Sequence, residues 1–162
     1  MSDPGQGTLH EIYTAMKEIE QAYIPGAVGE PDFVAYDYMP TGSTLPYPFS
    51  MRMDPIAKVD WRRMNQGSEN PLSYVIPVIV LVSRSSNDQG ALIREAERYV
   101  LPMIGLYFAN PYIKKTVRML RMDDIIMGDL TINGVKHYGV QFPIIIEQSK
   151  VLPVAPRYEP TP

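Results

Sequence analysis

The sequence predicts an α+β domain, in which two main helices pack on a mostly antiparallel, mixed sheet and the chain ends with a β-hairpin. Three observations support this class. A helical pattern opens the chain, a strongly apolar run at 72–83 follows shorter strand-like stretches, and the last third holds three further strand-like segments. Helices gathered against a largely antiparallel sheet form an α+β sandwich and not a doubly wound fold.

Length and composition are those of one globular domain. The chain has 162 residues, of which 45% are hydrophobic and 20% are charged. A chain of this size buries about two-thirds of the surface that its unfolded form exposes. We expect a flexible N-terminus over residues 1–7, a single domain over 8–150, and a proline-rich extended tail over 151–162.

The first helix is predicted to begin at Thr8. Glu11 stands three residues on, as in a capping box, and apolar residues then recur at helical spacing up to position 23. Pro25 and Gly26 are expected to end the helix. Four charged residues are expected to face solvent on its outer side: Glu11, Lys17, Glu18 and Glu20.

The next forty residues predict short strands between loops. Residues 32–39 and 49–54 have the composition and alternation of strands, and 56–61 could continue the sheet. Three prolines and a glycine make 40–48 an extended loop. The polar stretch 62–71 is expected to be a mobile loop.

Residues 72–83 predict the central strand, because Val78 to Val82 are apolar at every position and strands buried on both faces have this pattern. Pro77 conflicts with it, since proline is found at strand edges, starts or bulges. We therefore expect the fully paired part of the strand to begin after Pro77.

The main helix is expected within 85–111. Ser86 and Gln89 match a capping box, and Asp88 places negative charge at the positive end of the helix dipole. Pro102 lies well inside the helical pattern, so it should kink the helix or divide it in two.

The last third predicts strands at 113–122, 123–132 and 135–148. Asn133-Gly134 lies between the second and third, and this dipeptide between apolar runs is the strongest short-range signal for a β-hairpin.

Composition excludes several kinds of chemistry. The chain has no cysteine and only two histidines, so disulfides, thiolate catalysis and a histidine-rich metal centre are excluded. A net charge of -3 argues against a dedicated nucleic-acid binder. The apolar runs are too short for a membrane helix, and residues 1–11 lack the pattern of a secretory signal. We expect no cofactor and no membrane partner.

The strand–helix junction at 83–90 resembles places where enzymes bind phosphate or hold a nucleophile. Its sequence has one glycine and no lysine, so it matches neither a P-loop nor a dinucleotide fingerprint. Ser85 and Ser86 lack the flanking glycines of a nucleophile elbow. Helix capping accounts for the polar residues without a ligand.

Two further sets of charged residues are candidates for a site. Asp123 and Asp124, with Asp129 and His137, form the one carboxylate–histidine group, but neighbouring residues on a strand point to opposite faces and do not readily share a metal or a proton. We therefore expect no metal site and no catalytic set. Basic residues cluster at Lys114, Lys115, Arg118 and Arg121, and at Arg62 and Arg63 beside Trp61; we interpret them as a solvated face or a subunit contact.

The order of elements resembles that of the tail terminator (tail completion) proteins of long-tailed bacteriophages. The resemblance spans residues 9–148. It lies in a short first helix followed by "FVAYDYMP", "LPYPFSMRM", "YVIPVIVLVSRS", "ALIREAERYVLPMI" and "HYGVQFPIIIEQ". The Leu45-Pro46-Tyr47 step and the strand that ends in "VSRS" are its most particular points. Pro102 and the proline-rich tail depart from what the resemblance leads us to expect.

The resemblance implies a structural virion protein that forms a ring, expected to have six copies, on the last ring of the tail tube and presents a surface to the head connector. The implied partners are the chain itself, the tail tube protein and the connector or neck proteins, with DNA passing transiently through the lumen. The implied place is the tail–neck region of a virion assembled in bacterial cytoplasm. The candidate assembly residues are Tyr38, Leu45, Pro46, Tyr47, Trp61, Arg62, Arg63, Lys114, Lys115, Arg118, Asn133 and Gly134.

Rings need heterologous contacts, in which different patches of each copy meet head to tail. The basic run at 114–121 and the acidic first helix are candidates for such patches. Two alternatives stay open: another neck component, such as a head-closure protein, and a small-ligand-binding or enzymatic α+β domain that uses the junction at 83–90.

Overall fold

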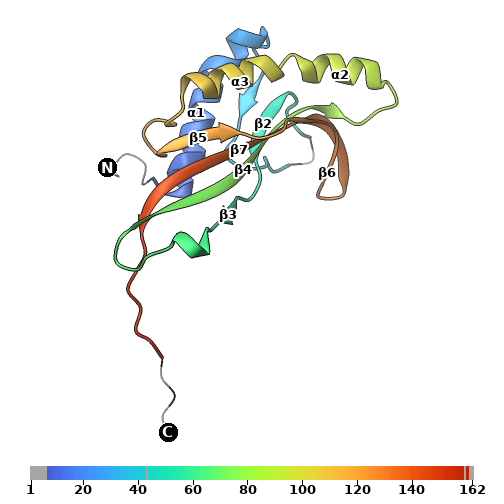
Figure 1. The fold of residues 1–162 in the computed structure, drawn as a ribbon. Helices are drawn as coiled ribbons and strands as arrows, with labels where there is room; N and C mark the ends of the chain where they lie inside the picture. Colours follow the sequence, from blue (N-terminus) through green and yellow to red (C-terminus); the bar gives the residue numbers. More distant parts are fainter. Residues whose placement is uncertain (1–6, 43, 159, 161–162) are drawn as a thin grey trace.

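The structure, a computed structural model, describes residues 7–42, 44–158 and 160. Three helices cover one face of a single seven-stranded sheet, which confirms the α+β class (Figure 1). In chain order the elements are α1 (Leu9–Val28), β1 (Val34–Ala35), β2 (Phe49–Arg52), β3 (Ile56–Lys58), the 3-10 helix η1 (Trp61–Arg63), β4 (Glu69–Arg84), α2 (Gln89–Glu97), α3 (Val100–Ala109), β5 (Met119–Met122), β6 (Ile126–Ile132) and β7 (Val135–Val151).

Two long antiparallel strands, β4 and β7, form the centre of the sheet. They pair over almost their whole length, from Glu69 opposite Val151 to Arg84 opposite His137. Two shorter strands flank each of them: β2 and β3 lie beside β4, and β5 and β6 lie beside β7. We call the part of the sheet with β1, β2 and β6 the hairpin half, and the part with β3 and β5 the open half. Only β1 and β2 are parallel among these pairs.

A pair of prolines separates the two halves. Pro77 of β4 lies directly opposite Pro143 of β7, so the prediction that full pairing begins after Pro77 is wrong. The Pro77 carbonyl accepts a hydrogen bond from Met53, and the Pro143 carbonyl accepts one from Asp123. Because neither proline has an N–H to return, each flanking ladder is interrupted there. The interruptions coincide with the change from β2 to β3 and from β5 to β6.

The main core lies between the helices and one face of the sheet. It combines the apolar side of α1 with Ile76, Val78 and Val80 of β4 and with Val140 and Phe142 of β7. The Thr8 hydroxyl accepts a hydrogen bond from the Glu11 amide, as the capping prediction requires.

The end of α1 differs from prediction. The helix passes through Pro25 and Gly26 and ends at Val28, where Gly29 adopts the left-handed conformation with φ of 75°. Burial of Ile24 and packing of Val28 against the core favour this extra turn. Pro25 removes one hydrogen bond near the helix end, and the C-terminal residues of the turn still bond to its carbonyl.

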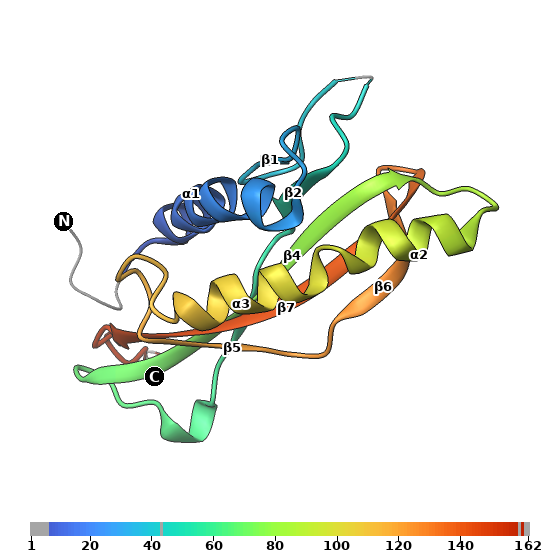
Figure 2. The ribbon, with the colours of Figure 1, turned by 90° about the horizontal axis from the view of Figure 1, so that it is seen from above.

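Pro102 divides the predicted main helix into α2 and α3, which lie end to end over the sheet (Figure 2). Pro102 is the third residue of α3, where an N–H would have no partner within the helix. The cap of α2 is Asp88 and not Ser86: its carboxylate accepts from the Ala91 amide at 3.1 Å. Ser86 instead accepts, through its carbonyl, a hydrogen bond from the side chain of Gln89.

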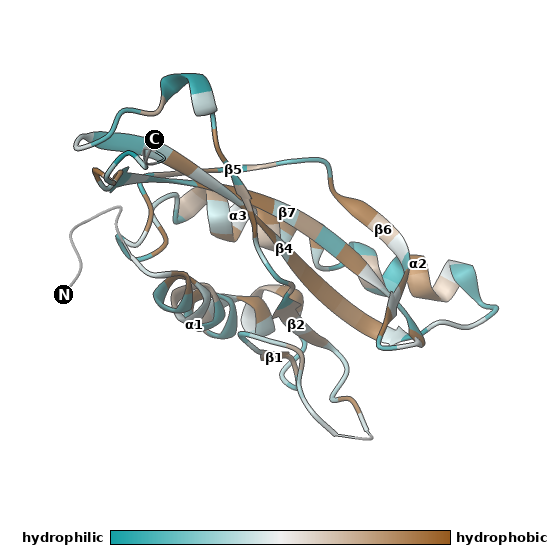
Figure 3. Ribbon diagram, turned by 90° about the horizontal axis from the view of Figure 1, so that it is seen from below, coloured by the Kyte–Doolittle hydropathy of each residue, from teal (hydrophilic) through white to brown (hydrophobic). Residues whose placement is uncertain are grey.

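A second, smaller core covers the other face of the hairpin half. It contains Phe49 and Met51 of β2 with Ile79 and Leu81 of β4, so both faces of β4 are buried here, as predicted. Figure 3 shows apolar residues along much of β4 and β7, and hydrophilic residues where the two strands approach the C-terminal end of the chain. The predicted strand 32–39 is mostly loop, since only Val34 and Ala35 pair with β2.

The last third contains the predicted hairpin. Asn133 and Gly134 both have positive φ, 52° and 78°, as a type I′ turn requires. The predicted strand at 113–122 begins only at Met119, because residues 113–115 adopt left-handed backbone conformations.

The ends and the polar stretch 62–71 also differ from expectation. Gly7 is buried and its amide bonds to the Thr116 carbonyl, while residues 1–6 lie outside the described residues. The buried Asn70 side chain holds the stretch 62–71 in place. Its Oδ1 accepts a hydrogen bond from the Asn65 amide, and its Nδ2 donates one to the Asn65 carbonyl. Strand β7 continues to Val151, one residue into the predicted tail.

Candidate assembly surfaces

The predicted assembly residues fall into two groups at opposite ends of the sheet. Tyr38, Leu45, Pro46 and Tyr47 lie on the loop before β2. Leu45 and Tyr47 line the same hollow as Asn133 of the β6–β7 turn, whereas the ring of Tyr38 lies against Tyr13 of α1. The other group lies at the far end of the open half, where β4 begins and β7 ends (Figure 1). It consists of Trp61, Arg62, Arg63, Lys114, Lys115 and Arg118.

The loop and the hairpin turn enclose a hollow of about 640 Å³. Leu45 and Tyr47 are half-buried here and pack against the second core, so they hold the loop in place and are not mainly exposed contacts. The hydroxyl of Tyr47 and Nδ1 of His137 lie 2.5 Å apart. His137 Nε2 is buried without a protein partner, and Arg84 lines the same hollow.

Burial and a neighbouring cation set the protonation of this group. Burial lowers the pKa of His137, and the positive charge of Arg84 lowers it further. Burial raises the pKa of the Tyr47 phenol, and Arg84 opposes that shift. Both side chains are therefore neutral near pH 7.

At the strand–helix junction the polar residues contact other parts of the same chain. The Ser85 hydroxyl donates to Asp129 of β6 at 2.6 Å, and Asp88 caps α2. The first contact joins the end of β4 to β6, and the second is a helix cap, which agrees with a structural interpretation of the junction.

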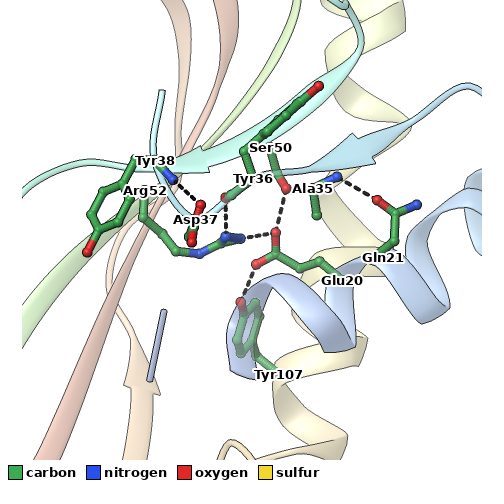
Figure 4. Close-up of polar contacts among 9 residues, drawn as sticks. All are labelled: Glu20, Gln21, Ala35, Tyr36, Asp37, Tyr38, Ser50, Arg52 and Tyr107. Carbon is green, nitrogen blue, oxygen red and sulfur yellow. Dashed lines mark hydrogen bonds and ion pairs between the residues drawn. The ribbon is translucent and has the colours of Figure 1, made fainter. Parts of the chain in front are cut away.

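The most buried polar cluster was not predicted. Glu20 of α1, expected to face solvent, is fully buried and forms an ion pair with the equally buried Arg52 of β2 (Figure 4). Ser50 donates to the Glu20 carboxylate at 2.5 Å, and the Tyr107 hydroxyl of α3 also donates to it. Burial, and then the charge of Glu20, raise the pKa of Tyr107, so its hydroxyl stays a donor.

This cluster positions the loop that precedes β2. Arg52 Nη1 donates to the Tyr36 carbonyl at 2.7 Å, while Gln21 bonds to both Phe33 and Ala35. The loop from Tyr36 to Tyr47 is thus anchored at its base to α1 and β2. The buried ion pair has a structural role, and the loop beyond it carries Tyr38 on the surface, 49% exposed.

The basic end is exposed. Trp61 is 85% exposed, and Arg62 and Arg63 follow it in η1. On the other border Lys114 forms an exposed ion pair with Glu18 of α1 in the same chain. The acidic side of α1 therefore neutralises part of the basic run internally, which weakens the idea that these two patches meet between copies.

A second apolar stripe on α3 was missed in the sequence. Leu101 and Phe108 are 76% and 86% exposed, and Ile104 lies between them on the same side. A hollow of about 400 Å³ separates this part of α3 from β5, lined by Ile104, Phe108, Leu120 and Met122 among others. The sequence does contain a signal for this stripe: positions 101, 104 and 108 are apolar at helical spacing, but they lie off the stripe of residues that face the core.

Metal and membrane sites find no structural support in the described part of the chain. Among those residues no group of three or more His, Asp or Glu side chains could hold a metal ion. Asp129 contacts Ser85, while Asp123 and Asp124 are exposed at the β5–β6 connection. No helix there combines the length and the apolarity needed to cross a bilayer.

Comparison of the chain with models of known protein families finds no match, and comparison with curated protein sequences finds none either.

Proposed function

We propose that this chain is a structural virion protein that forms a ring, of six copies, on the end of a phage tail tube and joins the tail to the head connector. The proposal extends the resemblance to tail terminator proteins. One structural observation supports it most: large apolar side chains are exposed at opposite borders of the sheet, Trp61 beside β3 and Phe108 beside β5.

Such side chains mark interaction surfaces when they gather in patches. Two different patches on opposite sides of a subunit fit heterologous, head-to-tail contacts, which close into rings when the rotation between copies allows it. The anchored loop at 36–47 and the turn at Asn133-Gly134 lie at one end of the sheet. We propose that they contact the tube or the connector.

The test is the oligomeric state. Light scattering of the purified chain over a range of concentrations, with negative-stain imaging, should give a mass of several copies and ring-shaped particles. The same measurement with isolated tail tubes should place the particles at tube ends. A chain that stays monomeric at every concentration, with and without tubes, contradicts the proposal.

A ligand-binding function is the second candidate, and the hollow next to Tyr47 favours it. The buried His137 Nε2 without a protein partner, together with Arg84, would suit a small anion. Inorganic phosphate or acetate should then raise the unfolding temperature of the wild-type chain and leave that of Arg84→Ala unchanged. Equal responses of the two proteins would exclude specific binding at this hollow.

A further inference from the structure

The two outer strands of the open half, β3 and β5, run in opposite directions, as two strands that pair in an antiparallel sheet must. Here four strands lie in the order β3, β4, β7, β5, and every neighbouring pair is antiparallel. One row across them runs from Ala57 through Tyr74 and Ile146 to Leu120. With four alternating strands the outer two, β3 and β5, run in opposite directions. In Figure 1 β5 lies at the upper border and β3 at the lower border of the sheet.

We propose that copies of the chain join head to tail through these borders, so that β5 of one copy pairs with β3 of the next in one continuous antiparallel sheet. This inference rests on the proposed ring and names its subunit contact. A second copy placed beside the first in the same orientation brings its β3 next to β5 with antiparallel polarity, and no strand has to turn round.

The hydrogen-bonding groups on the two borders also match. The carbonyls of Pro77 and Pro143 accept from Met53 and Asp123, so alternate residues of β4 and β7 bond to the outer strands. Hydrogen-bonded and non-bonded pairs alternate along an antiparallel ladder. By this alternation the main-chain N–H and C=O groups of Ala57 and Leu120 point away from the sheet. Within the described residues no main-chain group bonds to either of them on that side.

The side chains suit the same contact. Ala57 and Leu120 both lie on the helix side, because their row includes Ile146 of the main core. Small Ala57 would lie beside Leu120 at the hollow under α3. Since β3 runs antiparallel to β5, the residues after β3, exposed Val59 and Trp61, would lie where the chain leaves α3 and enters β5. There the neighbouring copy would cover the exposed side chains of Val59 and Trp61.

The hairpin half does not offer a second pair of borders. On one side its outermost strand is β1, and the Gln21 side chain bonds to the Ala35 amide and the Phe33 carbonyl there. On the other side, no strand in the described part of the chain pairs with the outer edge of β6. A head-to-tail contact through this half would still have only one open border, because Gln21 occupies the β1 side. A twofold dimer through β5 alone would leave β3 and Trp61 uncovered, whereas head-to-tail pairing covers both borders in every copy.

The joint also brings Arg62 and Arg63 near Lys115 and Arg118, all exposed. Like charges repel, and exposed charges are largely screened from each other only beyond about 10 Å at 0.1 M ionic strength, a distance that shrinks to about 3 Å at 1 M. Experiments on this contact should therefore be run at high as well as low salt.

Cysteine cross-linking tests the contact directly, since the chain contains no cysteine. Residues opposite each other in a hydrogen-bonded pair have Cα atoms about 5.5 Å apart, within the range that a disulfide spans. After mild oxidation the double variant Ala57→Cys/Leu120→Cys should give a ladder of linked oligomers on a non-reducing gel. A mixture of the two single variants should stop at dimers, and each single variant alone should stay monomeric.

The matched control is Ala57→Cys/Met127→Cys. Met127 lies on the same long border as Leu120, in β6, with its side chain on the helix side opposite Val140. This pair should give no ladder. A ladder from the control pair, or dimers from Leu120→Cys alone, would overturn the proposed pairing and indicate contact through β6 or a twofold β5 dimer.

A second variant separates the contact from folding. Ala57→Pro removes an N–H that points to solvent, which edge strands tolerate. The urea concentration at the midpoint of its unfolding should equal that of the wild-type chain, but light scattering should no longer show the higher-mass species. Ala57→Val should keep the same midpoint and the higher-mass species. If Ala57→Pro still forms rings in negative stain, the β3–β5 contact is wrong but the ring function stands. If the wild-type chain forms no rings at all, the proposed function fails as well.

Discussion

The two halves of the sheet share the same central strands and differ in how their faces and borders are covered. In the hairpin half both faces of β4 are buried, and the β2 side is closed by β1 and Gln21. In the open half all three residues of β3 are exposed, and so are Met119 and Arg121 of β5. Pro77 and Pro143 lie at the boundary. The hairpin half is therefore buried on both faces of β4, whereas the open half contributes to the main core on one face and has exposed residues on both outer strands.

The largest expected effect comes from the ion pair beneath the hairpin half. Glu20→Ala leaves Arg52 buried without its counter-charge and removes the acceptor of the Ser50 and Tyr107 hydroxyls. Breaking such a pair costs about 3–5 kcal/mol. Urea unfolding measures the loss. The matched control is Glu18→Ala in the same helix, which removes an exposed pair with Lys114 and should cost about 0–1 kcal/mol. Similar losses in both variants would contradict the structural role of Glu20.

A matched pair of methionines compares the two halves directly. Met51 in β2 is fully buried, and Met119 in β5 is 49% exposed. Met51→Ala should lower the free energy of unfolding by about 2–5 kcal/mol, as for other buried methionines. Met119→Ala should change it by less than about 0.5 kcal/mol. Both values come from urea unfolding of dilute protein, where copies do not associate. A large loss for Met119→Ala would mean that the open half also supports the monomer.

The third prediction concerns a close approach of β4 and β7 in the hairpin half. A Cβ on Gly139 would lie 2.1 Å from the Val80 carbonyl oxygen, and a backbone atom cannot move aside as a side chain can. Gly139→Ala should therefore cost about 1–3 kcal/mol, the usual range for overpacking. The control, Gly105→Ala in α3, meets nothing within 4 Å and should stabilise the chain by about 0.5–1 kcal/mol. Thermal unfolding should show shifts of opposite sign, and shifts of the same sign would contradict this account.

Local signals predicted much of this fold. The Thr8 cap, the division of the main helix at Pro102 and the Asn133-Gly134 turn each depend on residues close in sequence. The apolar run at 78–82 predicted a strand covered on both faces, because that pattern reports burial directly.

Features that depend on distant partners could not be predicted in this way. Glu20 resembles any exposed glutamate on a helix until Arg52, 32 positions later, is placed beside it. Pro77 reads as a strand breaker in isolation, yet opposite Pro143 it interrupts only the outer ladders and leaves β4 and β7 paired. Among the candidate assembly residues, Leu45 and Tyr47 pack against the second core, whose buried residues come from the three strands β2, β4 and β6, so this packing depends on segments far apart in the sequence.

The smallest expected effect is a pH dependence that belongs to the hairpin half. Burial, and then the charge of Arg84, lower the pKa of folded His137 below the value of about 6.5 expected in the unfolded chain. As the pH falls below about 6.5, His137 binds a proton in the unfolded chain before it does so in the folded one. The free energy of unfolding therefore decreases as the solution becomes more acidic. His137→Asn keeps a group that can bond to Tyr47 but does not titrate. The unfolding temperature of the wild-type chain should therefore fall more steeply between about pH 7.5 and pH 5.5 than that of His137→Asn. Parallel profiles would show that His137 does not stay neutral in the folded protein, and the burial inferred for its ring would then be wrong.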